Sequence, residues 1–152
     1  MEYTMTYDLS ENSPAKMIRT AVFMEEQGFQ DEFDQQDHTS WHFVFYQNGK
    51  PFGCARIFNT PNNPNRITLG RVAILKEYRG LHLGMDMLSA IEEEVKKMNV
   101  QIIELSAQVR VQPFYEKAGF QAIGETYMDE HCPHIHMEKN LYFKTCISLA
   151  TG

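Results

Sequence analysis

A strand, a glycine-containing turn and a helix follow one another without a linker over residues 71–84, which read Arg-Val-Ala-Ile-Leu-Lys-Glu-Tyr-Arg-Gly-Leu-His-Leu-Gly. The first amides of a helix lack partners within the helix and lie at the positive end of its dipole, and glycine lets a ligand approach the backbone closely. Such a turn suits a pyrophosphate. Neither a Gly-Lys-Ser/Thr sequence nor a GxGxxG sequence is present, so the turn is neither a Walker loop nor a dinucleotide fingerprint.

The composition narrows the class of protein. A chain of 152 residues is expected to form one domain with a substantial core. The net charge of −6 argues against nucleic acid as a partner. No leader-like segment opens the chain and no apolar run approaches the ~20 residues that span a membrane, which favours the cytoplasm. The three cysteines have unrelated spacings, which indicates reduced thiols rather than a disulfide framework.

Turn and cap signals divide the chain into short elements. Ser13-Pro14 is typical of a helix start, and Gly28 is expected to end that helix. Asn48-Gly49 predicts a hairpin turn. The predicted strands are 3–8, 41–47, 50–58, 67–75, 101–106, 120–128 and 134–139, with helices over 14–27, 83–98 and 113–117. The acidic stretch 31–38 is interpreted as an exposed loop.

This order of elements, without repeats or long linkers, predicts an α/β fold: a mixed, mostly antiparallel central sheet with helices on both faces. We expect a single domain over residues 1–140 and a C-terminal extension of uncertain structure over residues 141–152. The extension is apolar enough to pair as a strand or to cover a partner subunit, so a homodimer is a possibility.

Two segments resemble the GCN5-related N-acetyltransferases, the GNAT superfamily. One is Arg79-x-x-His82-x-Gly84, which follows Val72-Ala73-Ile74, and the other is Phe114-Tyr-Glu-Lys-Ala-Gly-Phe120. Finer features are similar to the ElaA/YjcF-like branch; they are Val22-Phe23, Glu26-Gln27, Asp34, Asp37, Gly70-Arg71-Val72-Ala73, Ala107-Gln108 and Pro133-His134-Ile135-x-Met137. The resemblance covers roughly residues 15 to 140. It implies the GNAT-type sheet and an acetyl-CoA-dependent acyltransferase.

The resemblance also implies the cofactor contacts. Backbone groups of residues 72–74 would pair with the pantetheine arm as an added strand does, and the amides of residues 80–85 would hold the pyrophosphate. The expected cofactor-binding residues are Val72, Ala73, Ile74, Arg79, Gly80, Leu81, His82, Leu83, Gly84 and Met85. The family usually has glycine where this chain has His82, so a side chain must fit a tight turn or contact a phosphate. Arg56, Arg71 and Arg110 are either further phosphate contacts or surface ion pairs.

Tyr115 is the expected general acid, because a neutral phenol can protonate the departing thiolate. The amine must lose a proton before attack, and the candidates for its base are Glu26, Glu104 and His134, with His42 a further possibility. The cysteines form no recognisable Cys/His arrangement, which favours direct transfer in a ternary complex over an acyl-enzyme.

Residues 131–136 contain four potential metal ligands, namely His131, Cys132, His134 and His136. Alternate residues of one strand rarely close a tetrahedral site alone, and Pro133 disturbs the pairing, so no metal is expected. The acidic residues between 25 and 37 form either a solvated loop or a surface that attracts a cationic amine.

We therefore expect a cytoplasmic acetyl-CoA-dependent N-acetyltransferase. It would act on a primary amine, a small molecule or a peptide, and have neither nucleic acid nor a membrane as a partner. The alternatives are a non-catalytic CoA-binding module or sensor, motivated by His82, and a metal-binding protein built on residues 131–136. Spacing does not distinguish an amino sugar, a polyamine, an aminoacyl compound or a peptide N-terminus as the acceptor.

Overall fold

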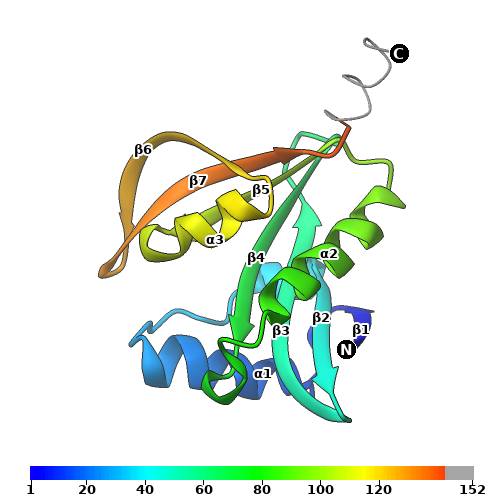
Figure 1. Ribbon diagram of the computed structural model, residues 1–152, viewed down its shortest axis with the longest axis vertical. Coiled ribbons are helices and arrows are strands. Elements are labelled where there is room, and N and C mark those ends of the chain that lie inside the picture. Colours follow the sequence, from blue (N-terminus) through cyan, green and yellow to red (C-terminus); the bar gives the residue numbers. More distant parts are fainter. Residues whose placement is uncertain (143–152) are drawn as a thin grey trace. The chain divides into compact units, whose positions relative to one another are not determined.

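The computed structural model describes residues 1–142 (Figure 1). The strands are β1 (Glu2–Tyr7), β2 (Trp41–Gln47), β3 (Lys50–Asn59), β4 (Arg66–Ile74), β5 (Ile102–Gln108), β6 (Gln121–Asp129) and β7 (Cys132–Asn140). The helices are α1 (Pro14–Arg19), α2 (Leu83–Lys96) and α3 (Gln112–Lys117). Shorter turns of helix are η1 (Thr20–Glu26), η2 (Gln35–Thr39), η3 (Lys76–Tyr78) and η4 (Val109–Val111).

The strands follow the order β1-β2-β3-β4-β5-β7-β6 in a seven-stranded sheet. The pairs β1–β2, β2–β3, β5–β7 and β6–β7 are antiparallel. The predicted α/β fold with a mostly antiparallel sheet is therefore confirmed. Among the described residues, no helix is long and apolar enough to span a membrane.

The chain divides into two compact units, one of residues 1–58 and 69–90 and one of residues 59–68 and 91 onward. Strand β4 and helix α2 each contribute residues to both units. The single domain predicted over residues 1–140 stays a prediction, and most of the predicted extension, from residue 143 on, lies outside the described residues.

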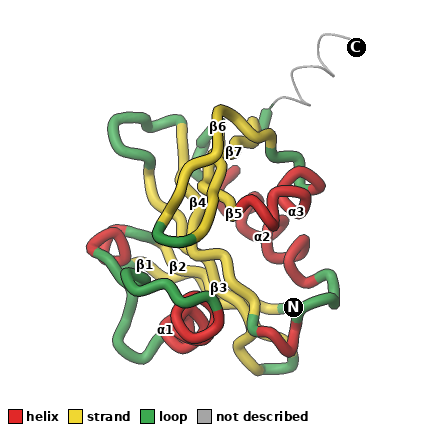
Figure 2. Tube along the Cα trace, turned by 90° about the vertical axis from the view of Figure 1, so that its left-hand side faces the viewer, coloured by secondary structure: helices red, strands yellow, loops and turns green. Residues whose placement is uncertain are grey.

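In the first unit, the helical segment α1–η1 packs its apolar residues against the strands, and Figure 2 shows α1 alongside them. Ile18, Val22 and Val44 belong to this buried core. The predicted N-cap is confirmed, because the Ser13 hydroxyl accepts a hydrogen bond from the Ala15 amide at 3.2 Å. From Thr20 the helix continues with π-type geometry, which often occurs near functional sites.

The second unit contains the antiparallel strands β5, β7 and β6, together with α3. Residues alternate between the two faces of a strand. Ile103, Leu105 and Met137 are buried on one face. The register then places polar side chains together on the other face; they are Glu104, Ser106 and Gln108 of β5 and His134, His136 and Glu138 of β7. This polar face carries two of the predicted bases.

Candidate active site

The structure has a turn before α2 at the residues predicted to bind the pyrophosphate, and this turn lies in the first unit. Gly80 has φ +79° and His82 has φ +62°, and α2 begins at the next residue, Leu83. His82 thus occupies the left-handed region, where histidine is tolerated better than most residues. Both Gly80 and His82 are exposed. The turn accommodates the histidine immediately before the N-terminus of a 14-residue helix, and the first amides of a helix generally lack partners within the helix.

Residues 72–74, the predicted pantetheine-binding segment, form the last three positions of β4. Gly53 on β3 lies close to this segment, since a Cβ on Gly53 would be 3.1 Å from the Ala73 carbonyl oxygen. The Ile74 carbonyl accepts a hydrogen bond from Arg79 Nε at 3.0 Å. One backbone acceptor of the segment is therefore already occupied by a side chain.

Arg79 and Glu26, predicted to have separate roles, are paired. The Arg79 nitrogens donate to both Glu26 oxygens at 2.5 and 2.8 Å. This bidentate hydrogen bonding, more than the attraction between the charges, raises the pKa of Arg79. Both side chains are more than a third exposed. Arg79 must release Glu26 before it can bind a phosphate, and Glu26 is a weaker candidate for the base while it is paired.

Carboxylates of the acidic segment 31–38 form a buried charge network with arginines, and no pattern in the sequence indicates it. Arg19 is 1% exposed. It donates to Glu32 Oε2 at 2.8 Å and to Asp37 Oδ1 at 2.8 Å. Arg56 contacts Asp34 at 2.6 Å and Asp37 at 2.9 Å. The prediction of a wholly exposed loop is wrong for Glu32 and Asp37, because three arginines compensate their charges.

Arg71 is the third arginine of this network, and its backbone is strained. It has φ +53° within β4, and its side chain pairs with Glu32 at 2.9 Å and Asp34 at 3.2 Å. Burial lowers the pKa of Arg71. Carboxylates of the same unit pair with Arg56 and Arg71, so either guanidinium would have to exchange a partner to bind a phosphate; that role stays a prediction.

The network also shifts the pKa values of its carboxylates. Burial alone would raise the pKa of Asp37, but hydrogen bonds from Arg19, the Asp34 amide and Arg56, with the charge of Arg19, lower it to about 2. Glu32 behaves oppositely, because burial outweighs its arginine partners and raises its pKa. Glu32 and Asp37 thus anchor the segment 31–38 through buried ion pairs, while Asp31, Asp34 and His38 of the same segment are exposed.

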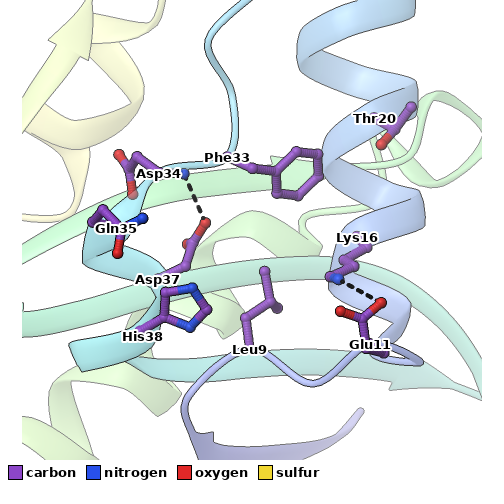
Figure 3. A pocket seen from close by; sticks show the side chains of 9 residues that line it. All are labelled: Leu9, Glu11, Lys16, Thr20, Phe33, Asp34, Gln35, Asp37 and His38. Carbon is purple, nitrogen blue, oxygen red and sulfur yellow. Dashed lines mark hydrogen bonds and ion pairs between the residues drawn. The ribbon is translucent and has the colours of Figure 1, made fainter.

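A pocket of about 480 Å³ opens beside this segment in the first unit (Figure 3). Its lining is formed by Leu9, Glu11, Lys16, Thr20, Phe33, Asp34, Gln35, Asp37 and His38. Glu11 and Lys16 pair across 3.5 Å, and the Phe33 ring receives the Arg19 guanidinium at 4.7 Å. The pocket combines carboxylates with an aromatic ring, groups that recognise an ammonium ion.

In the second unit, Tyr115 lies on α3 and is 8% exposed. Its ring meets that of Phe120 edge to face, with centroids 5.8 Å apart. Burial raises the pKa of the phenol, so Tyr115 remains neutral at physiological pH. This protonation state is the one that a general acid requires.

The two base candidates of this unit, Glu104 and His134, occupy the polar face of the sheet. Glu104 pairs with Arg66 at 3.1 Å and accepts from the Thr60 hydroxyl at 2.8 Å. His134 Nδ1 lies 2.9 Å from the Cys132 carbonyl oxygen, so Nδ1 carries a proton and Nε2 is the basic nitrogen of the neutral ring. The His134 ring stacks on Tyr127, whose hydroxyl bonds to that of Ser106.

The sequence of the chain is similar to those of acetyltransferases. The acetyltransferase (GNAT) domain model matches residues 8–141. ElaA of Escherichia coli is 30% identical over 82% of this chain and 84% of its own, and YjcF of Bacillus subtilis is 29% identical over 81% and 88%.

The same relationship is seen among solved structures. The crystal structure of ElaA covers 91% of this chain and 99% of its own at 26% identity, with a TM-score of 0.80. A GNAT acetyltransferase from Elizabethkingia anophelis with acetyl-CoA bound shares the fold, with a TM-score of 0.69 and 13% identity over 91% of this chain and 97% of its own. The chain belongs to the GNAT acetyltransferase family, and to its ElaA/YjcF-like branch.

Proposed function

We propose that this protein transfers the acetyl group of acetyl-CoA directly to a primary amine, within a ternary complex. The observation that carries the proposal is the turn before α2, where Gly80 and His82 hold positive φ and present the helix N-terminus within a family of acetyltransferases. Because acetyl-CoA is an intracellular metabolite, we propose the cytoplasm as the location.

The first unit would bind the cofactor. The amides of residues 80–85 would hold the pyrophosphate, and backbone groups of residues 72–74 would pair with the pantetheine arm. Arg79 is positioned by the Ile74 carbonyl at the end of that segment. When the cofactor binds, Arg79 would release Glu26 and bind a phosphate oxygen. The exchange is reasonable because a carboxylate and a phosphate both accept hydrogen bonds from the two guanidinium nitrogens.

Tyr115 of the second unit would stabilise the departing thiolate. Its burial raises the phenol pKa, whereas an alkyl thiol such as that of cysteine has a pKa of about 8.5. Complete proton transfer from Tyr115 to sulfur is therefore uphill. A hydrogen bond from the phenol to the developing thiolate therefore supplies the main stabilisation.

His134 would be the base that accepts the proton of the amine, directly or through water. Glu26 and Glu104 both accept from arginines, which stabilises their charged form and weakens them as bases. His134 donates a hydrogen bond from Nδ1 to the Cys132 carbonyl, which orients the ring.

Direct transfer is supported by the state of the buried thiol. Cys54 is 1% exposed and burial raises its pKa to about 12, so it supplies no thiolate to carry an acetyl group. Cys132 is only half-buried, but its sulfur contacts the Pro133 carbonyl and no histidine contact that would activate it is seen in the described residues.

The experiment is a screen of amines for acetyl-CoA-dependent release of free thiol, with the acetylated product identified by mass spectrometry. The panel contains an amino sugar, a polyamine, an aminoacyl compound and a peptide with a free N-terminus. Cationic acceptors are expected to react best, because the pocket beside Phe33 carries the carboxylates of Glu11 and Asp34. Both carboxylates are paired with cationic side chains in this structure, so an ammonium group would bind by exchange with those partners. If acetyl-CoA binds but no amine is acetylated, the protein is a CoA-binding module and not an enzyme.

A further inference from the structure

Three side chains with metal-binding chemistry meet on the polar face of the second unit. Glu104 on β5 is the direct cross-strand partner of Glu138 on β7, and His136 lies two residues before Glu138 on the same face. One ligand atom from each of these residues lies within 4.8 Å of the other two. All three side chains are partly withdrawn from solvent, with 14%, 21% and 36% exposed for Glu104, Glu138 and His136.

Their ligand atoms are close enough together for one tetrahedral ion to bind all three residues after a small adjustment. Bonds of about 2.0–2.2 Å to a tetrahedral zinc ion place neighbouring ligand atoms roughly 3.3–3.6 Å apart. His136 Nε2 lies 3.5 Å from Glu104 Oε2, within this range. It lies 2.8 Å from Glu138 Oε2, a hydrogen bond that zinc would replace by moving the two atoms slightly apart. One imidazole nitrogen and two carboxylate oxygens form a donor set that zinc accepts, and a fourth position remains for water.

A cation already occupies the space between the two carboxylates. Arg66 Nη1 is 2.7 Å from Glu138 Oε2 and 3.1 Å from Glu104 Oε2. Like charges directly opposite each other destabilise an antiparallel pair, so these carboxylates require a positive charge. The hydrogen bond to Glu138 is the main cause of the raised pKa of Arg66. The Arg66 side chain is 26% exposed, which leaves it a route out to solvent.

We propose that Glu104, His136 and Glu138 bind a zinc ion, and that Arg66 is the counter-cation which zinc displaces. A zinc ion carries two positive charges to the two carboxylates, whereas the Arg66 guanidinium carries one. Zinc also bonds to the His136 imidazole. The site differs from the ligand-rich run 131–136, because only His136 is shared. Of that run, His134 contacts the Cys132 carbonyl and Cys132 contacts the Pro133 carbonyl. The proposal does not depend on the acetyltransferase reaction.

Zinc binding to the tag-free full chain tests the site by calorimetry, with metal content after dialysis measured by elemental analysis. We expect one equivalent of zinc, and at least a roughly tenfold weaker affinity in His136→Ala and in the nearly isosteric Glu138→Gln. His131→Ala, at an exposed histidine five residues away, is the matched control and should bind as the unmodified protein does. Arg66→Gln should bind zinc more tightly, because it removes the competitor.

Cobalt substitution supplies a second readout that does not depend on activity. Cobalt bound by four ligands should absorb visible light strongly, and this absorption should be lost in His136→Ala and retained in His131→Ala. Circular dichroism of each variant separates loss of the ligand from loss of the fold. The proposal is overturned if the folded protein binds no equivalent of zinc, or if His131→Ala weakens binding as much as His136→Ala does.

Discussion

Tyr115 is the residue on which the proposed chemistry depends most. It is a buried neutral phenol, and replacing it with phenylalanine removes one hydroxyl while keeping the ring that packs on Phe120. We expect Tyr115→Phe to lower kcat by about 100-fold or more, the usual contribution of a positioned acid. The dissociation constant of acetyl-CoA, measured by calorimetry, should be unchanged. Equal losses in kcat and in binding, or no loss in either, would contradict the assigned role.

His82 tests the alternative of a non-catalytic CoA-binding module. The residue already has φ +62° and an exposed side chain, so the turn keeps its shape despite the histidine. His82→Gly should therefore change the acetyl-CoA dissociation constant by less than about threefold, equivalent to less than about 0.7 kcal/mol. A gain in affinity of tenfold or more would show that His82 has damaged the phosphate site.

The sequence predicted individual residues well where their effect is local. Ser13 caps α1, and Asn48 and Gly49 have φ +52° and +78°, as a type I′ turn requires. It did not predict the partners of Arg19, because Glu32 and Asp37 lie 13 and 18 residues away and meet it only after the chain folds. An acidic run alone does not reveal which of its carboxylates are buried.

At the scale of elements, the close contact between β3 and the first unit's part of β4 requires a residue without a side chain at position 53, which is Gly53. A Cβ on Gly53 would lie 2.9 Å from Met87 Sδ and 3.1 Å from the Ala73 carbonyl oxygen. Gly53→Ala should lower the free energy of unfolding by about 1–3 kcal/mol in urea titrations, since overpacking shifts backbone as well as side chains. Gly70→Ala is the control, because its nearest neighbour is 4.0 Å away. Similar losses in both variants would refute this explanation.

The segment between η1 and β2 is held by the buried charge network. Arg19→Met keeps much of the volume but removes the buried arginine that contacts both Glu32 and Asp37, so we expect a loss of about 3–5 kcal/mol in the free energy of unfolding. Lys16→Met, on the same helix, breaks only a partly exposed pair with Glu11 and should lose less than about 1 kcal/mol. Chemical denaturation of both variants measures the difference. A loss below about 1 kcal/mol for Arg19→Met would mean that the network contributes little.

The elements were predictable to within two or three residues because periodicity, caps and turn residues act locally. The helix after the phosphate turn shows this, since Leu83, Met87, Ile91 and Val95 are all buried along one face. The π-type geometry of η1 was not predictable, because its residues fit an ordinary helix equally well. The positive φ of Arg71 was also missed, since arginine gives no signal for a strained backbone.

At the scale of the whole molecule, the family relationship spans both compact units, since the matched residues 8–141 include parts of each. The sequence predicted this relationship because the turn at residues 79–84 and the segment 114–120 are specific in spacing as well as in composition. The acceptor remained unpredicted, because the sequence does not reveal which side chains of residues 9–38 come together around the pocket beside Phe33. The charges of these side chains indicate a class of ligand rather than one compound.

The most direct test of acetyl-CoA dependence is the melting temperature of the protein with acetyl-CoA, beside dephospho-CoA and ATP as controls. A ligand that binds only the folded state at ~100 times its Kd adds about 2.7 kcal/mol of stability, which should raise the melting temperature of a chain of this size by roughly 5–10 °C. We predict such a rise with acetyl-CoA and a smaller one with either control. No rise at millimolar acetyl-CoA would contradict the cofactor assignment and the transferase reaction that rests on it.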